Sequence, residues 1–299
     1  MYNTFTATTQ PMEIQMGTEL VKMNDELNNI MAALDEGDVE TLMKASGQDD
    51  GASKSGGNGL PRLTINYTEE TEEGISLKKG VWKIWNGSAV MYADKVQVRP
   101  LMRTYEWSLW NQEEQKFSCK SVQRPSLGGD FPDTLGGNKC GRLSKQEEDE
   151  LAGDDPRVLL SRSVNCNQVI YGTITATGTL ADGTEASVTD MPFVGYFKRS
   201  GFRPVRDFIE QQLTKKKILM QKAIIEMTTE KNKNGGVIYW TPKLALVKEV
   251  SISDDDKALV NQFMDTVRGH NESVMESYRM ASKMNMDGDD VDLADRLAG

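Results

Sequence analysis

The sequence predicts a mainly β fold of the α+β class, in which an antiparallel barrel carries one inserted helix and has helices at both ends. Two observations carry this prediction. Nine segments are rich in β-branched and aromatic residues and are bounded by turn residues, which is typical of short strands. Helical periodicity is confined to the two ends of the chain and to one stretch between strands, residues 205–217.

The predicted strands alternate clearly enough to assign their side chains to faces. Val96 and Val98 fall on one face, with Lys95 and Gln97 on the other, as expected for a half-buried strand. Tight hairpins are predicted where Ala-Asp-Gly ends at Gly183 and where Asn-Gly-Gly follows Lys233. Nine short strands with one inserted helix favour an OB-like barrel over a sandwich. The strands are expected at residues 60–67, 80–85, 90–99, 101–110, 116–123, 168–180, 187–199, 221–229 and 236–250.

Changes in composition divide the chain into five predicted segments. Leu20, Leu27 and Leu34 recur at heptad spacing in the first of them, and the Gly- and Ser-rich stretch that follows is a flexible tether. Ser253 and Asp256 form a capping box that starts the last helix. The segments are an N-terminal helical segment (1–46), a flexible linker (47–59), an OB-like β domain (60–250), a C-terminal helix (251–285) and an acidic tail (286–299).

The formal net charge of the 299-residue chain is −10, and this charge is unevenly distributed. Residues 1–59 carry 3 basic and 10 acidic groups, and residues 251–299 carry 5 and 11. In the β domain, residues 74–128 hold 9 basic and 4 acidic groups, and residues 195–250 hold 12 and 5. An acidic protein with this distribution can still present a basic surface to a polyanion.

The residue types needed for most catalytic and metal sites are scarce. The three cysteines, Cys119, Cys140 and Cys166, contain no CxxC pair, so neither a disulfide framework nor a structural zinc site is predicted. His270 is the only histidine and is interpreted as a surface residue of the C-terminal helix. No signal peptide and no apolar run of about 20 residues is found, so we expect a cytoplasmic protein without a membrane segment. We expect no enzyme activity, no cofactor and no metal.

Basic and aromatic residues are interleaved in four stretches, residues 78–85, 99–110, 196–206 and 231–240, which together contain all five tryptophans. Lysine and arginine follow phosphates, while aromatic rings stack on unpaired bases, at about 1–3 kcal/mol per base. Any one of these rings is as readily explained as a core residue, so the prediction of single-stranded DNA binding depends on the repetition. The candidate residues are Lys83, Trp85, Arg99, Arg103, Tyr105, Trp107, Lys198, Arg199, Phe202, Arg203, Lys231, Lys233, Tyr239 and Trp240.

The acidic tail suggests regulation of such a site. A flexible polyanion can occupy a basic groove until DNA displaces it, or it can recruit replication proteins. A tail that only keeps the protein soluble is the alternative. The candidate regulatory residues are Asp287, Asp289, Asp290, Asp292 and Asp295.

Four short stretches resemble single-stranded DNA-binding proteins of tailed phages. They are residues 60–63 (LPRL), 135–141 (LGGNKCG), 201–204 (GFRP) and 234–242 (NGGVIYWTP). The resemblance covers about residues 60–285 and implies an OB fold, action in phage DNA replication or recombination, and a location in the host cytoplasm. The chain departs from the family pattern in its N-terminal helix and linker, and in a tail that ends Leu-Ala-Gly without a terminal Phe.

Two other classes of function remain open from the sequence. A phage structural or assembly protein would form a homo-oligomer through its terminal helices and would not bind oligonucleotides. A nuclease or other metal enzyme that uses carboxylates would cleave labelled DNA when magnesium is present.

Overall fold

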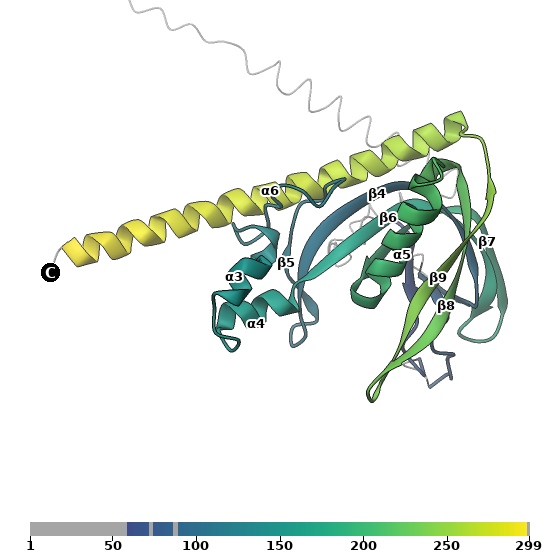
Figure 1. Cartoon of the computed structure of the whole chain (residues 1–299), viewed down its shortest axis with the longest axis horizontal. Coiled ribbons are helices and arrows are strands. Elements are labelled where there is room, and N and C mark those ends of the chain that lie inside the picture. The colour runs from purple at the N-terminus through teal and green to yellow at the C-terminus, as the bar shows by residue number, and fades with distance from the viewer. Residues whose placement is uncertain (1–58, 72–73, 86–88, 298–299) are drawn as a thin grey trace, which may run out of the picture. The chain divides into compact units, whose positions relative to one another are not determined.

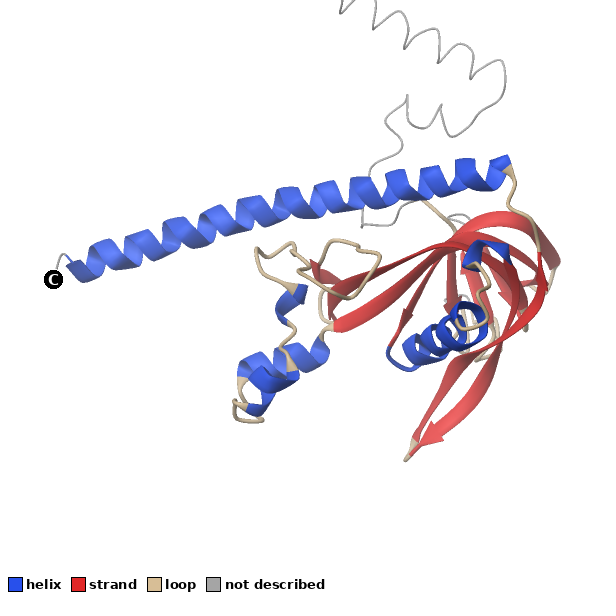
Figure 2. Cartoon of the chain, turned by 45° about the horizontal axis from the view of Figure 1, so that its top comes forward, coloured by secondary structure: helices blue, strands red, loops and turns tan. Residues whose placement is uncertain are grey.

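The computed structural model describes residues 59–71, 74–85 and 89–297 (Figure 1). The predicted N-terminal helical segment and nearly all of the linker lie outside these residues. The described part is mainly β, as predicted, with one extended sheet and several helices (Figure 2). Its strands are Arg62–Ile65 (β1), Trp82–Trp85 (β2), Val90–Ala93 (β3), Val96–Asn111 (β4), Lys116–Lys120 (β5), Asn165–Leu180 (β6), Glu185–Lys198 (β7), Ala223–Asn234 (β8) and Val237–Glu249 (β9).

Five strands close into a barrel in the order β3-β2-β1-β7-β6, and a pairing between β3 and β6 completes the ring. The expectation of a wholly antiparallel barrel is wrong, because β1 and β7 pair in parallel, with Arg62 opposite Val194. The reason is geometrical: strand directions cannot alternate all the way round a ring of five, so at least one pair of neighbours must be parallel. Beyond the barrel, β4 pairs with β6, and β8 and β9 extend the sheet from β4.

Both predicted hairpin turns connect adjacent strands. β6 and β7 pair down to Thr179 and Glu185, next to Gly183, whose φ of +86° favours glycine. β8 and β9 pair down to Asn234 and Val237. The sequence therefore locates these turns correctly, because each needs residues that tolerate positive φ.

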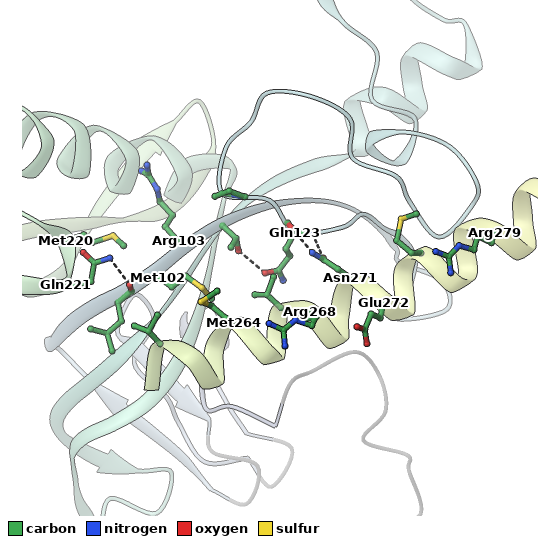
Figure 3. Close-up of a pocket in the computed structure, with 16 residues that line it drawn as sticks. Met102, Arg103, Gln123, Met220, Gln221, Met264, Arg268, Asn271, Glu272 and Arg279 are labelled. Carbon is green, nitrogen blue, oxygen red and sulfur yellow. Dashed lines mark hydrogen bonds between the residues drawn. The ribbon is translucent and has the colours of Figure 1, made fainter. Parts of the chain in front are cut away.

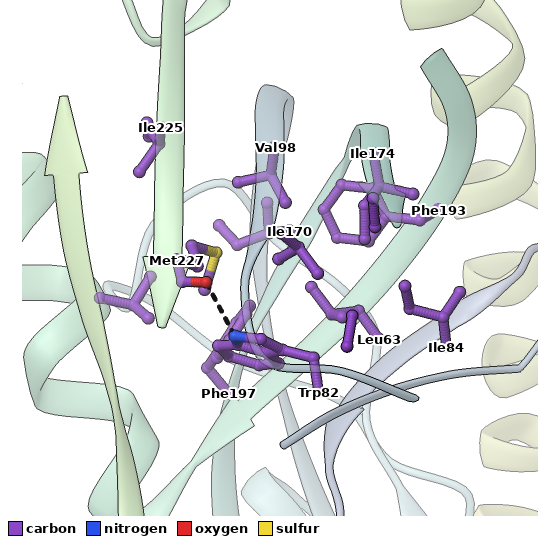
Figure 4. Packing of buried hydrophobic residues seen from close by; sticks show 14 of the residues in the cluster. Leu63, Trp82, Ile84, Val98, Ile170, Ile174, Phe193, Phe197, Ile225 and Met227 are labelled. Atoms are coloured by element: carbon purple, nitrogen blue, oxygen red, sulfur yellow. Dashed lines mark hydrogen bonds between the residues drawn. The ribbon is translucent and has the colours of Figure 1, made fainter. Parts of the chain in front are cut away.

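The main core fills the space between the barrel, β8 and the inserted helix (Figure 4). Trp82 is fully buried in it, and its indole Nε1 donates a hydrogen bond to the carbonyl oxygen of Met227 at 2.9 Å. This bond satisfies the one polar atom of the ring and joins β2 to β8. The inserted helix, predicted at 205–217, begins at Phe202 as α5 (Phe202–Phe208) and continues as a π-helical segment, η4 (Ile209–Thr214).

A long helix, α6 (Asp254–Leu297), follows the strands and runs beside the barrel (Figures 1 and 2). It begins with the predicted capping box: the backbone N–H of Ser253 donates to Asp256 at 2.6 Å, and the N–H of Asp256 donates to the Ser253 hydroxyl at 3.1 Å. Phe263 is buried against a second core cluster, made of Leu101, Val169, Tyr171 and Val194.

The C-terminal helix is longer than predicted. We expected it to end at residue 285, before the acidic tail, whereas α6 continues to Leu297. Extending an existing helix adds a hydrogen bond for each residue without a new nucleation step, so an acidic composition alone does not end it. No described helix is long and apolar enough to span a membrane.

The stretch between β5 and β6, which we call the excursion, consists mainly of loops. It holds a 3-10 turn, η2 (Lys139–Gly141), and two short helices, α3 (Lys145–Asp149) and α4 (Pro156–Ser163). A capping box between Ser144 and Glu147 begins α3. Two further 3-10 turns, η3 (Arg199–Gly201) and η5 (Met220–Lys222), flank the inserted helix.

Candidate nucleic-acid interface

Strand register brings basic and aromatic side chains together on the side of the barrel that faces away from the main core. In β2, Trp82 and Ile84 are buried, so Lys83 and Trp85 point the other way. Trp85 lies opposite Arg62 in β1, which in turn lies opposite Val194 in β7. We call this surface the outer face and define it by Arg62, Lys83, Trp85, Trp110, Phe117, Lys120, Tyr196 and Lys198.

The same surface continues across the remaining strands. Lys198 of β7 pairs with Asn167 of β6, which pairs with Glu106 of β4. One step along β4, Ser108 pairs with Lys120 of β5. Lys198 and Lys120 therefore lie on the same side of the sheet, with the buried Asn167, Glu106 and Ser108 between them.

Cations and rings are in direct contact on the outer face. The guanidinium carbon of Arg62 lies 5.7 Å from the centroid of the Trp85 ring, and Nζ of Lys120 lies 4.3 Å from that of Phe117. Phe117 packs edge-on against Trp110, with ring centroids 4.9 Å apart. Trp85, Trp110 and Phe117 are each about 40% exposed, so they remain accessible to a flat ligand.

Partial burial is the main influence on the charge of two lysines of this surface. It lowers the pKa of Lys120, while Glu106 opposes the shift and Arg62 adds a smaller lowering. Burial also lowers the pKa of Lys198, with Arg199 adding to the effect and Glu106 opposing it. A polyanion that binds here would favour the charged form of both lysines.

A buried polar network supports the outer face from beneath. Glu106 is 3% exposed and accepts hydrogen bonds from Gln123 Nε2 at 2.9 Å and from Asn167 Nδ2 at 3.2 Å. His270 of α6 lies 3.8 Å from the same carboxylate, and its Nε2 is 3.0 Å from the carbonyl oxygen of Ser121. His270 is thus part of the contact between α6 and the barrel, where the sequence suggested an exposed helix position.

Next to the outer face, β1 and β7 separate after Leu63 and Gly195, and a cleft of about 340 Å³ opens between them. Its lining includes Tyr67, Lys198, Arg199 and Trp240. The rings of Tyr67 and Trp240 meet nearly at right angles, 5.8 Å apart, and the Tyr67 hydroxyl donates to the carbonyl oxygen of Trp240 at 3.1 Å. The volume lies within the range of small-ligand pockets.

Cross-strand pairing adds one more predicted residue to this cleft. Lys231 of β8 lies opposite Trp240 of β9, so the two side chains share a face of the hairpin. Lys233 follows on the same face, closer to the turn, whereas Tyr239 points to the opposite one. The fold therefore brings four of the candidates together at or beside this cleft: Lys198, Arg199, Lys231 and Trp240.

Four other candidates form a separate cluster on the opposite side of β4. Tyr105 is 5% exposed and packs against Phe202, with ring centroids 6.2 Å apart. Arg103 lies 5.4 Å from the Tyr105 ring and lines a pocket between β4 and α6 (Figure 3). Trp107 packs edge-on against Phe131. The thickness of the sheet separates this cluster from the outer face.

The remaining two arginines have acidic partners. Arg99 forms an ion pair with Asp256 at 2.8 Å and also donates to the carbonyl oxygens of Gln221 and Ser251. Arg203 is exposed and pairs with Asp207 at 3.2 Å. The predicted regulatory aspartates, 287–295, fall in the last turns of α6, and their role stays a prediction.

Several residues of the interface were not among the candidates. Arg62, Phe117 and Lys120 each lie outside the interleaved stretches, so a search for such stretches misses them. Trp110 and Tyr196 lie inside two of the stretches, 99–110 and 196–206, but were not chosen as candidates. Alternation could have placed Arg62 on the outer face, because Leu63 beside it is buried.

Comparison with protein-family models, with curated proteins and with solved structures finds no match for this chain.

Proposed function

We propose that this protein binds single-stranded DNA along the outer face. The observation that carries the proposal is the row of cations and exposed rings that strand pairing assembles from β2, β1, β7, β4 and β5. Arg62, Lys120 and Lys198 hold phosphates, and Trp85 and Phe117 stack on bases. The adjoining cleft, with Tyr67 and Trp240, lies where a strand leaving Lys198 would pass.

The chemistry of this surface favours single strands over duplexes. In a duplex the base faces are stacked on one another, so exposed aromatic rings gain nothing from them, whereas a single strand offers each base for stacking. Sequence readers of duplex DNA place a helix or a ribbon in the major groove. The outer face instead presents rings on a curved sheet, and none of the eight residues that define it is acidic.

The fold is compatible with this role. A five-stranded barrel is the architecture of OB folds, which bind oligonucleotides across their strands, and we propose that the barrel is OB-like. Together with the resemblance of the four short stretches, this supports the proposed role in phage DNA replication or recombination in the host cytoplasm. It acts without catalysis, and its acidic C-terminus contacts replication proteins.

The test is binding of fluorescent oligo-dT by the full chain across a salt series. The logarithm of the affinity should fall linearly with the logarithm of salt concentration, by about 0.7 for each phosphate neutralised on a single strand. Lys198→Gln and Lys120→Gln should each reduce that slope by about 0.7. Lys243→Gln, on the exposed side of β9, is the matched control and should leave the slope unchanged.

Three outcomes would contradict the proposal. The first is no binding of oligo-dT at low salt. The second is equal affinity for duplex and single strand, and the third is a slope that falls as much for Lys243→Gln as for Lys198→Gln.

A further inference from the structure

Three acidic side chains meet behind β5, on the side of the sheet opposite Lys120. Cys119 of β5, Cys140 of η2 and Asp133 of the intervening loop each place a ligand atom within 4.8 Å of the other two. All three are buried, with exposures of 3% or less. The thiol of Cys140 hydrogen-bonds with Cys119, and its Sγ lies 3.4 Å from the carbonyl oxygen of Trp107. Two thiols and one carboxylate are a ligand set for zinc.

The backbone around Cys140 is held in an unusual conformation. Lys139 and Cys140 both have a φ of +54°, and Gly141 has +80°. The left-handed region costs a non-glycine residue about 1–2 kcal/mol, and such conformations persist where the surroundings hold them in place, often at functional sites. Here the N–H of Cys140 donates to Oδ2 of Asp133 at 2.8 Å, so the turn and the carboxylate fix each other.

Asp133 is itself positioned by a second set of hydrogen bonds. Its Oδ1 accepts from the N–H groups of Leu135 at 3.0 Å and Gly137 at 3.1 Å. Outer hydrogen bonds of this kind orient carboxylates that bind metals. Oδ2 of Asp133 accepts a hydrogen bond from the N–H of Cys140. A carboxylate oxygen has two lone pairs, so the second lone pair of Oδ2 can bind a metal.

The segment between β5 and α3 has little regular structure to hold it to the sheet. Between β5 and α3 the regular structure consists of η2 and isolated bridges, Tyr105 to Arg124, Ser121 to Asp133 and Pro132 to Asn138. The buried apolar residues are divided between two small clusters, one with Cys119, Cys140 and Val164 and one with Val122 and Phe131. A metal bound by Cys119 and Cys140 would join η2 directly to β5.

We propose that Cys119, Asp133 and Cys140 bind one Zn²⁺ ion, which ties the part of the excursion between β5 and α3 to the sheet. The two thiols each lose a proton as their Zn–S bonds form, and Oδ2 of Asp133 supplies the third ligand. A water molecule fills the fourth position of the tetrahedron. The site is structural and lies on the opposite side of the sheet from the outer face, so it does not depend on DNA binding.

The experiment refolds the full chain from denaturant, under reducing conditions, with Zn²⁺ or with EDTA, and measures bound metal after gel filtration. We expect about one zinc per chain for the wild type, as for a stoichiometric structural site. Cys119→Ser and Cys140→Ser should lose the metal. Cys166→Ser is the matched control, because Cys166 lies outside the cluster, and it should retain the metal.

Two further readouts keep the proposal testable if a serine variant does not fold. Wild-type protein refolded with Co²⁺ should show a thiolate-to-cobalt charge-transfer band, which a carboxylate-only site lacks. Protein refolded with EDTA should be cut faster by trypsin after Arg124 and Lys139 than protein refolded with zinc. A wild type without bound zinc or the cobalt band, or folded serine variants that keep both, would overturn the proposal.

Discussion

At the scale of single residues, Gly80 shows how one missing side chain shapes the cleft. A Cβ at this position would overlap the indole ring of Trp240, and the φ of Gly80 is +78°. Gly80→Ala should therefore combine a backbone penalty of about 1–2 kcal/mol with displacement of the ring. We expect a lower free energy of unfolding and an altered tryptophan emission spectrum in the folded state, both measurable by fluorescence during urea titration.

Gly183→Ala is the control for that substitution. Gly183 has a similar φ, +86°, with nothing within 4 Å of the position its Cβ would take. Gly183→Ala should lower the free energy of unfolding only by the cost of the positive φ. It should leave the emission spectrum of the folded state unchanged. Equal losses for the two variants would mean that Trp240 is not held against Gly80.

The lowered pKa of Lys198 gives a second prediction at this scale. A lysine with a lowered pKa loses its charge at a lower pH than an ordinary lysine, and the neutral amine attracts no phosphate. Oligo-dT affinity should therefore fall as pH rises through this lowered pKa, below the usual value of 10.5. In Lys198→Arg the charge persists and the fall should move to higher pH. An identical pH profile in both proteins would exclude Lys198 from the contact.

At the scale of elements, the ion pair between Arg99 and Asp256 fixes the start of α6 on β4. Both side chains are largely buried, at 14% and 12% exposure, and Arg99 also binds the carbonyl oxygen of Ser251 just before the helix. Arg99→Gln leaves the carboxylate without its cation, a change that costs about 3–5 kcal/mol for a buried pair. We expect a loss toward the lower end of that range and faster amide exchange in the first turns of α6.

The exposed pair of Lys257 and Asp254, on the same turn, provides the comparison. Lys257→Gln should cost less than about 1 kcal/mol, as is usual for surface pairs. The double variant Arg99→Gln with Asp256→Asn should recover part of the loss, because no unpaired charge is left buried. A double variant as unstable as Arg99→Gln would show that the arginine acts through its backbone contacts instead.

Elements were predicted best where local chemistry alone determines them. The turn before Glu185 needs a residue with positive φ, which Gly183 supplies. The capping box of α6 needs Ser253 and Asp256 three residues apart. Both features can therefore be predicted from the sequence. The parallel pairing of β1 with β7 has no local signature, since it follows from closing a ring of five strands. For the same reason Cys119 and Cys140, distant in the chain, gave no sign that the fold joins them.

At the scale of the whole molecule, the outer face is a product of topology. Arg62, Lys120 and Lys198 come from three distant parts of the sequence, and the extended sheet places them on one side, near Glu106. Of the candidates read from the sequence, Lys83, Trp85 and Lys198 lie on it, whereas Tyr105 and Phe202 pack on the other side of the sheet. Interleaving in the sequence shows which strands carry basic and aromatic residues, but only the strand pairing shows which face each residue lies on.

In the proposed function, the width of the outer face sets the length of single-stranded DNA that it can hold. Five spacings separate β2 from β5 by way of β1, β7, β6 and β4, which at about 4.8 Å each makes about 24 Å. So short a path corresponds to the lower end of the range of about 4–16 nucleotides occupied by one OB fold. Affinity for oligo-dT should therefore rise steeply with length up to about 4–6 nucleotides and slowly beyond, because further nucleotides add registers without new contacts. Fluorescence anisotropy with a series of oligonucleotides measures this directly, and Trp85→Ala, which removes the ring at one end of the row, should move the break to a shorter length. A steep rise that continues well past this length would mean that the strand follows another path or that several chains bind it together.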